Sequence, residues 1–285
     1  MNTLRFFVLM AAMTGLFLVL GQLLGGHNGM LIALAIAGAM NFWAWWNSDQ
    51  AVLAMYNAIE VGPDQAPELY GIVRELARRG NLPMPRVYVI DDPSPNAFAT
   101  GRDPEHAAVA ATSGILRILT REELAGVMAH ELAHVQHRDI LIGTMTATLA
   151  GAITTLANFA GLFSSGRSDD EEEERGMGWP GQIVMLFLAP LAATLIQMAV
   201  SRSREYDADQ GGARLCGNPL WLASALHKLE RGSQNIPLTG AAEHPATAHL
   251  FIVSPLSAGL VAGLFSTHPP MEERIARLQG MVHSR

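Results

Sequence analysis

Cysteine is nearly absent from the sequence, since Cys216 is the only one among 285 residues and no disulfide can form within the chain. This excludes the small secreted scaffolds that depend on disulfide bonds, and it fits a reducing compartment. A lone cysteine is more often an inert thiol than a nucleophile. Cys216 is therefore not expected to carry chemistry.

Charged residues are also scarce, at 16% of the chain, and the net charge of −7 comes without a clustered basic face. Nucleic acid is therefore not an expected partner, because proteins bind it through such faces. The mean hydropathy of +0.20, together with the low charge, favours a membrane protein over a soluble one. The length allows one or two domains.

Two apolar runs stand near the N-terminus, Phe6 to Leu24 and Met30 to Trp46. Each is long enough to cross a bilayer core of about 30 Å as a helix. The first run is too long for a signal peptide and no A-x-A site directly follows it. Residues 1–46 are therefore predicted to form two retained transmembrane helices, joined by a turn at Gly25 to Gly29.

Two further apolar runs, Ile140 to Phe163 and Ile183 to Val200, are also long enough to span. They predict a transmembrane hairpin over 140–200, with an outer loop at 164–178. An acidic run in that loop, Asp169 to Glu174, predicts a solvated segment or a site for a cation or partner. The alternative is that the two runs form a buried hairpin of a larger soluble part.

A small sheet is predicted between these pairs of runs. Asp64 to Arg79 has the apolar face of an amphipathic helix. Short strands are expected at Arg86 to Ile90, Asn96 to Gly101 and Ala107 to Thr112. An exposed edge of such a sheet could pair with an extended peptide. Residues 47–139 are interpreted as a cytoplasmic catalytic part.

The sequence His130-Glu131-Leu132-Ala133-His134 follows this sheet and has the form H-E-x-x-H. Thr120 and Glu123 form a capping box ahead of it, which predicts that the stretch is helical. On a helix the two histidines lie on one face about 6 Å apart along the axis, so both can bind one zinc ion. Glu131 is then left beside the metal as a base. Without further context, the pattern is also compatible with a chance histidine pair.

Zinc at a catalytic site needs a third protein ligand. In the H-E-x-x-H-x-x-G-x-x-H pattern this would be a histidine at position 140, but Ile140 stands there, which excludes that subclass. Glu205 is a candidate carboxylate ligand. Asp209, one helical turn further on, could accept the spare N–H of a ligand histidine and orient its ring.

The alternative is that Glu205 and Asp209 are ordinary helix-end charges, paired with Arg202 and Arg204. The predicted topology favours the metal site, because two membrane crossings separate His134 from Glu205 and return the chain to the same side. Residues 201–285 are therefore interpreted as a second cytoplasmic part that supplies the third ligand close to the bilayer surface. The distribution of arginines favours a cytoplasmic location for both termini and the catalytic parts.

These segments together resemble the HtpX-type membrane zinc proteases, a bacterial heat-shock family related to the CAAX prenyl endopeptidases. The resemblance covers nearly the whole chain except Ser164 to Gly178, and it includes Asn96 to Gly101, the H-E-x-x-H helix, Arg204 to Asp209, and Ser266 to Pro270 ahead of Arg274. The implied fold is α+β and mainly α, a zincin-like metalloprotease domain with a small sheet and about four transmembrane helices.

The resemblance implies one zinc ion per chain, bound by His130, His134 and Glu205, with Glu131 as the catalytic base. His268 is a candidate second donor to the oxyanion, with Arg274 behind it, although both could be structural. Four other side chains are expected to be interfacial, packing or solvent-exposed: His137, Tyr206, His244 and His249.

The expected function is a multi-pass endopeptidase of the bacterial inner membrane that cleaves misfolded membrane proteins, or other unfolded polypeptides, at its cytoplasmic face. Oligomerisation is left open. One alternative is a non-catalytic scaffold or chaperone subunit with structural zinc, although structural zinc prefers four protein ligands, usually with cysteine. Another is a metal-dependent hydrolase of a non-peptide substrate.

Overall fold

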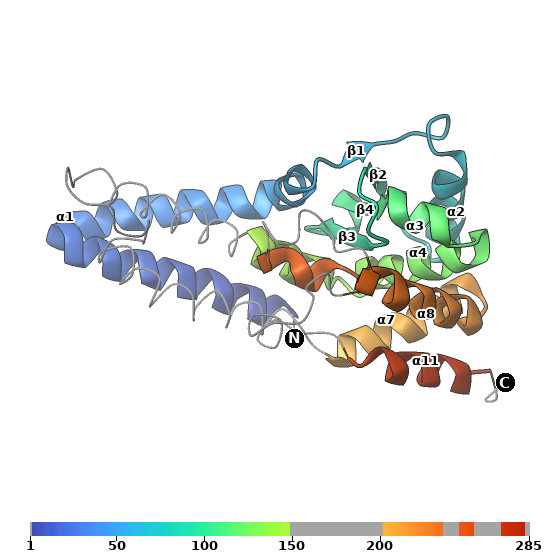
Figure 1. Ribbon diagram of the computed structural model, residues 1–285. Coiled ribbons are helices and arrows are strands. Elements are labelled where there is room, and N and C mark those ends of the chain that lie inside the picture. The colour runs from blue at the N-terminus through green and yellow to red at the C-terminus, as the bar shows by residue number, and fades with distance from the viewer. Residues whose placement is uncertain (1, 149–201, 236–244, 254–268, 283–285) are drawn as a thin grey trace, which may run out of the picture.

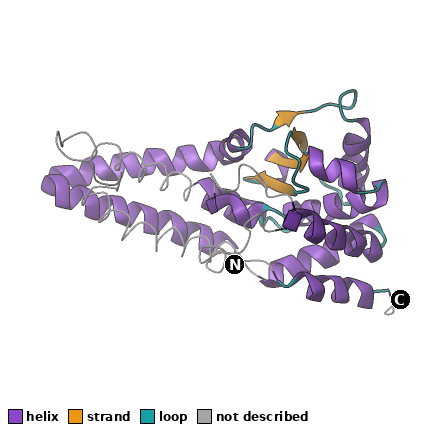
Figure 2. Cartoon of the chain, viewed as in Figure 1, coloured by secondary structure: helices purple, strands orange, loops and turns teal. Residues whose placement is uncertain are grey.

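A computed structural model describes residues 2–148, 202–235, 245–253 and 269–282. The chain forms a long helical arm that extends away from a domain of helices and a small sheet (Figure 1). Helices outnumber strands throughout the described part (Figure 2). The predicted mainly helical fold with a small sheet is confirmed. Most of the predicted 140–200 hairpin and its acidic loop lie outside the described residues.

The arm is one element, α1 (Asn2–Met55), which reverses direction at Gly25 and Gly26. Gly26 has a φ of 58°, in the left-handed region that glycine tolerates without strain. The two limbs touch close to this kink, where a Cβ on Gly29 would lie 2.3 Å from the carbonyl oxygen of Gly21. Further along, Asn41 Nδ2 donates to Thr14 Oγ1 at 3.0 Å. The predicted pair of N-terminal helices is therefore present.

One helix among the described residues, Gly25–Met55, is long and apolar enough to cross a membrane. The presence of about four transmembrane helices remains a prediction. This limb continues past Trp46, where the apolar run was expected to end. The polar residues after Trp46 do not break a helix, and Val52, Leu53 and Tyr56 find an apolar partner in the sheet.

The sheet has four strands in the order β1-β2-β4-β3, with β2 and β4 parallel and the outer pairs antiparallel. The strands are β1 (Ile59–Glu60), β2 (Arg86–Ile90), β3 (Ala97–Gly101) and β4 (Ala107–Thr112). The three predicted strands are confirmed, with β3 starting one residue later than expected. β1 was missed because two residues are too short to show an alternating pattern.

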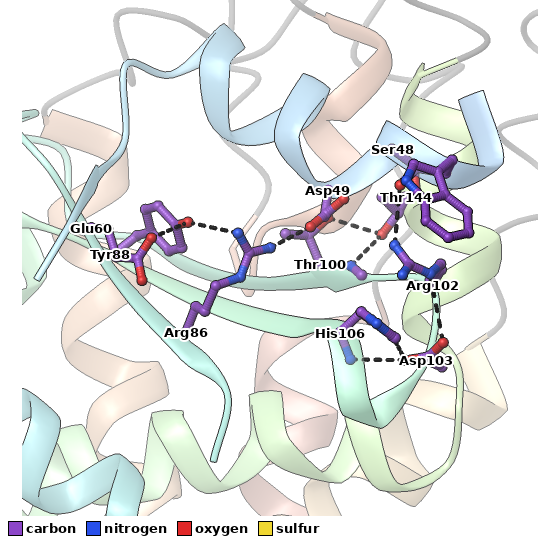
Figure 3. A network of polar contacts seen from close by, with 12 residues as sticks. Ser48, Asp49, Glu60, Arg86, Tyr88, Thr100, Arg102, Asp103, His106 and Thr144 are labelled. Atoms are coloured by element: carbon purple, nitrogen blue, oxygen red, sulfur yellow. Dashed lines mark hydrogen bonds and ion pairs between the residues drawn. The ribbon is translucent and has the colours of Figure 1, made fainter. Parts of the chain in front are cut away.

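The end of α1 is attached to the sheet by a polar network (Figure 3). The Arg86 guanidinium on β2 forms an ion pair with the buried carboxylate of Asp49. The Arg102 guanidinium just beyond β3 donates to the carbonyl oxygen of Trp46 at 3.1 Å and lies 4.5 Å from the centre of its indole ring. These contacts fix the apolar limb relative to the domain.

The remaining elements pack around α4. They are α2 (Pro67–Arg79), η1 (Pro104–His106), α3 (Ser113–Ile118), α4 (Arg121–Gln136), α7 (Arg202–Cys216), α8 (Pro219–Asn235), η2 (Pro245–Leu250) and α11 (Met271–Gly280). Residues 140–148 are also helical. The helix α4 contacts β3 and β4 and also packs against α2, α7 and α8, which makes it the centre of the domain.

Candidate metal centre

The predicted capping box begins α4. Glu123 N–H donates to Thr120 Oγ1 at 3.3 Å, and Thr120 N–H donates to Glu123 Oε2 at 2.8 Å. The Glu123 carboxylate also accepts hydrogen bonds from Ser224 and Lys228 on α8, each at 2.7 Å. The first turn of α4 is therefore fixed both locally and by tertiary contacts.

The two histidines and Glu205 come together at the other end of α4. The Nε2 atoms of His130 and His134 are 3.2 Å apart, and the Glu205 carboxylate oxygens lie 3.7 Å from the first and 3.6 Å from the second. Ligand atoms bound about 2.0–2.2 Å from one tetrahedral ion are separated by about 3.3–3.5 Å. The three side chains therefore fit the binding of a single metal ion.

Glu205 reaches the histidines because α7 crosses α4 at backbone contact. A Cβ on Gly212 of α7 would lie 2.8 Å from the backbone nitrogen of His130. Glu205, Asp209 and Gly212 have the i, i+4, i+7 spacing of one helix face, so the same face that allows the close crossing also presents both carboxylates. The crossing therefore determines where the candidate third ligand lies.

Asp209 and Arg274 both contact His130, Asp209 at Nδ1 and Arg274 at Nε2. The Oδ1 atom of Asp209 is 3.0 Å from His130 Nδ1. The fully buried Arg274 guanidinium donates to both Asp209 oxygens, at 2.9 and 2.7 Å. Burial by itself would raise the pKa of Asp209, but the Arg274 charge and hydrogen bonds hold it at about 2. Asp209 is therefore a carboxylate at neutral pH, able to accept the Nδ1 proton of His130 in a hydrogen bond.

Arg274 contacts Asp209 and lies 3.9 Å from Glu205. His268, which was expected in front of it, lies outside the described residues, and so does His244. Sequence reasoning gave Arg274 no link to Asp209, because nothing in the sequence indicates that α11 packs across α7.

A second carboxylate, Asp139, lies beside His134 and was also missed. Its Oδ2 atom is 3.4 Å from His134 Nδ1. Burial alone would lower the pKa of His134, but the hydrogen bond with Asp139 and the charge of Glu205 raise it to about 9. Burial lowers the pKa of His130 to about 4. One histidine is therefore expected to be neutral and the other protonated until a metal ion displaces its proton.

Glu131 is 2% exposed and lies next to β3. Burial raises the pKa of its carboxyl group to about 7, against the opposing effects of the His134 charge and a hydrogen bond from the backbone N–H of Ala99. A pKa near neutrality suits a group that must both take and give a proton. Glu131 therefore has the environment of a general base.

The site opens into a small cavity of about 60 Å³. Its walls include His249 and Leu250 of η2, which were not expected there. His249 was predicted to be exposed, but only 9% of it is, and its Nε2 lies 3.1 Å from the carbonyl oxygen of Gly143. Solvent exposure was expected for this irregular segment, whereas η2 packs against both β3 and the helix at 140–148.

Two other side chains lie away from the ligands. His137 is exposed at the end of α4. Tyr206 packs under the Arg277 guanidinium, which lies 3.7 Å from the centre of its ring.

The predicted edge of the sheet is present but is not exposed, since all five residues of β3 are buried. The β4 register turns the backbone groups of Ala97, Ala99 and Gly101 outward. The Ala97 carbonyl accepts a hydrogen bond from Ile252 N–H at 3.1 Å, and Gly101 N–H donates to Thr144 Oγ1 at 3.2 Å. Between these two residues, only Ala99 of β3 lines the cavity.

Two histidines and a buried glutamate on one helix, closed by a carboxylate from a second helix, define the site of a metalloprotease. The model of Peptidase family M48 matches residues 63–282, and the chain belongs to that family. A protein named Protease HtpX homolog from Methylibium petroleiphilum is 58% identical over 284 residues, covering 100% of this chain and 99% of its own. Another with the same name, from Ralstonia nicotianae, is 58% identical over 283 residues, covering 99% and 98%.

The resemblance drawn from the motifs is therefore confirmed, and the chain is a metalloprotease. The crystal structure of S. mikatae Ste24p matches with a TM-score of 0.50 at 17% identity. That match covers 97% of this chain but only 65% of Ste24p, and it shows a shared fold.

Proposed function

We propose that this metalloprotease is a membrane-bound zinc endopeptidase that hydrolyses peptide bonds in misfolded or damaged membrane proteins. The observation that carries the proposal is the arrangement of His130, His134 and Glu205 at zinc-compatible separations, with Glu131 beside them and outside the ligand set. Three protein ligands are typical of catalytic zinc, which keeps a fourth position open.

Zinc fits the donor set, because two imidazole nitrogens and one carboxylate are common ligands of catalytic zinc. When bound, the ion supplies Lewis acidity, polarising a carbonyl group and lowering the pKa of a water molecule. The Glu131 carboxylate then accepts a proton from the attacking water and delivers it to the nitrogen of the leaving amine. Asp209 and Arg274 would hold His130 with its Nε2 facing His134 and Glu205, the other two candidate ligands.

The position of Ala99, on an edge strand and in the wall of the cavity, supports a polypeptide as the substrate. An extended peptide can pair with the outward backbone groups of an edge strand, and Ala99 lines the same cavity as Glu131. The Ala99 N–H donates to Glu131, so the Ala99 carbonyl is the outward group offered to a peptide. Because Ile252 and Thr144 occupy the backbone groups on either side, only a short extended segment would pair there. An unfolded or locally unfolded chain meets this requirement, whereas a folded one does not.

The helix Gly25–Met55 supports the membrane location, since it presents large apolar side chains such as Phe42 and Trp43 on its outside. We place the active site on the cytoplasmic side of the bacterial inner membrane, in a multi-pass topology. The orientation can be tested by labelling Asp170→Cys in intact cells with an impermeant maleimide, because the sole native cysteine, Cys216, is buried. Labelling from outside is expected, whereas an Asp207→Cys control should need permeabilised cells.

The activity is tested by purifying the full chain in detergent and measuring zinc content and casein cleavage for wild type and Glu131→Gln. We expect full zinc content with cleavage reduced by about 10²–10⁴-fold, because the base is lost but the ligands are not. Glu122→Gln, an exposed neighbour on α4, is the matched control and should behave as wild type. Equal cleavage by Glu131→Gln would contradict the mechanism, and zinc without any cleavage by wild type would favour the scaffold alternative.

A further inference from the structure

The chain makes a tight reversal after α4 that brings Asp139 back onto His134. Arg138 adopts a φ of 58°, a left-handed conformation that is uncommon for a residue with a side chain. Asp139 N–H then donates to the His134 carbonyl oxygen at 2.9 Å, and the Asp139 carboxylate lies 3.4 Å from His134 Nδ1. The backbone therefore accepts an unfavourable conformation at the point that places this carboxylate beside a metal-site histidine.

We propose that Asp139 is a positioning residue for His134, which holds the imidazole with Nδ1 protonated and Nε2 directed at the metal. A carboxylate on the far nitrogen fixes both the tautomer and the ring orientation of a ligand histidine. Asp139 is 9% exposed, so the hydrogen bond is little weakened by competing water. The proposal rests on the proposed zinc site and is independent of the substrates.

The two histidines are then supported in parallel ways. His130 has Asp209 at its Nδ1, and Arg274 contacts both Asp209 and His130 Nε2. His134 has Asp139 at its Nδ1, and Arg204 Nη1 lies 4.0 Å from the other Asp139 oxygen. The second arrangement is looser by distance, and we therefore expect a smaller contribution to metal affinity from Asp139 than from Asp209.

Asp139 is also held from its C-terminal side. It directly precedes the helix at 140–148, and Thr144 of that helix shares a hydrogen bond with Thr100 of β3 at 3.0 Å (Figure 3). One turn later, Thr148 Oγ1 donates to the carbonyl oxygen of Ser48 in α1 at 3.5 Å. The helix that starts at Asp139 is therefore attached to both the sheet and the membrane arm, which restricts how far Asp139 can move.

A purely structural role is the competing explanation, because Asp139 stands where an N-cap residue of the helix at 140–148 would stand. Serine and asparagine cap helices about as well as aspartate. Asp139→Ser keeps a capping group but is too short to reach His134, while Asp139→Asn keeps both the cap and a neutral acceptor of the same length. The two variants therefore separate capping from positioning.

The test measures zinc dissociation constants of the full chain in detergent by competition with a chelator, together with the visible spectrum of the cobalt-substituted protein. Asp139→Ser should weaken zinc binding by about 10–100-fold and change the cobalt spectrum. Asp139→Asn should lose less affinity, because the amide oxygen still accepts the Nδ1 hydrogen bond. Asp207→Asn, an exposed carboxylate on α7, should match wild type in both measurements.

The proposal would be overturned if Asp139→Ser bound zinc with wild-type affinity and gave an unchanged cobalt spectrum. If the metal-free Asp139→Ser protein melts at a lower temperature than wild type, the zinc affinity and cobalt spectrum of Asp139→Asn, which keeps the cap, become the test. Affinity and spectrum equal to those of Asp207→Asn would then overturn the proposal. Failure of the wild type itself to bind zinc would instead reject the proposed zinc site.

Discussion

The fully buried guanidinium of Arg274 donates hydrogen bonds to both carboxylate oxygens of Asp209, at 2.9 and 2.7 Å. Both members of this bidentate pair contact His130, and they connect α11, near the C-terminus, to the metal site. An arginine without solvent access is stable only when its charge is compensated, and Asp209 and Glu205 provide that compensation.

Arg274→Gln is therefore expected to lower the free energy of unfolding by about 3–5 kcal/mol, because it leaves Asp209 buried without its partner charge. Zinc affinity should fall as well, since the support of His130 is lost. Arg214→Gln, on the exposed side of α7, is the matched control and should change stability by less than about 0.5 kcal/mol. Denaturant titration in detergent measures both variants, and equal stability of the two would contradict the role given to Arg274.

Glu205→Gln is expected to lose most bound zinc while keeping the fold. The amide has the shape of the carboxylate but lacks its charge, and zinc is bound by ionised carboxylates. Metal content after dialysis and the melting temperature of the metal-free protein are the two measurements. Retention of stoichiometric zinc by Glu205→Gln, with His134→Ala losing it, would mean that another residue is the third ligand.

Features set by residues close together in the sequence could be predicted, whereas features set by contacts between distant segments could not. Asp209 could be linked to the histidines because its spacing from Glu205 is one helical turn, which is a local property. Arg274 is 65 positions from Asp209, and on the amphipathic α11 it looks no different in the sequence from the exposed Arg277. Its burial depends on how α11 docks.

Asp139 and His249 were missed for related reasons. Asp139 lies in the turn after α4, and it is the left-handed conformation of Arg138 in this turn that brings it back to His134. His249 is in a segment whose proline and polar residues are typical of surface loops, yet the packing of Phe251 against Phe98 and Tyr56 anchors that segment in the core. Strands β2 and β4, by contrast, matched their predicted bounds because their apolar runs are long enough to be read locally.

The stability of the metal-free protein should depend on pH through Glu131. Its folded pKa of about 7 is above the ordinary value of 4.5, so its contribution to stability is fully present below pH 4.5 and is lost as the pH rises through 7. Glu131→Gln removes this dependence. The stability difference between wild type and variant should therefore shift by roughly 3 kcal/mol toward the variant between pH 4.5 and pH 7.5.

Thermal unfolding of the chelated proteins at a series of pH values measures this shift. Glu122→Gln is the control, because Glu122 is exposed on the same helix and its replacement should leave the pH dependence of wild type unchanged. The Glu131 charge also helps to raise the pKa of His134, so the comparison reports the titration of this coupled pair and not of Glu131 alone. A difference that stays constant across the range would show that folding does not raise the pKa of Glu131.

Gly212→Ala tests whether the crossing of α7 over α4 determines the metal site. The added Cβ would lie 2.8 Å from the backbone nitrogen of His130, and backbone cannot yield as a flexible side chain can, so the helices must separate. Unfolding should become easier by about 1–3 kcal/mol and zinc affinity should fall, because Glu205 moves away with α7. Gly71→Ala on α2, where an added Cβ meets nothing within 4 Å, should be neutral or stabilising. If Gly212→Ala lost stability but kept wild-type zinc affinity, the position of Glu205 would not depend on this crossing, and the carboxylate would have to be held by its own contacts with Arg274.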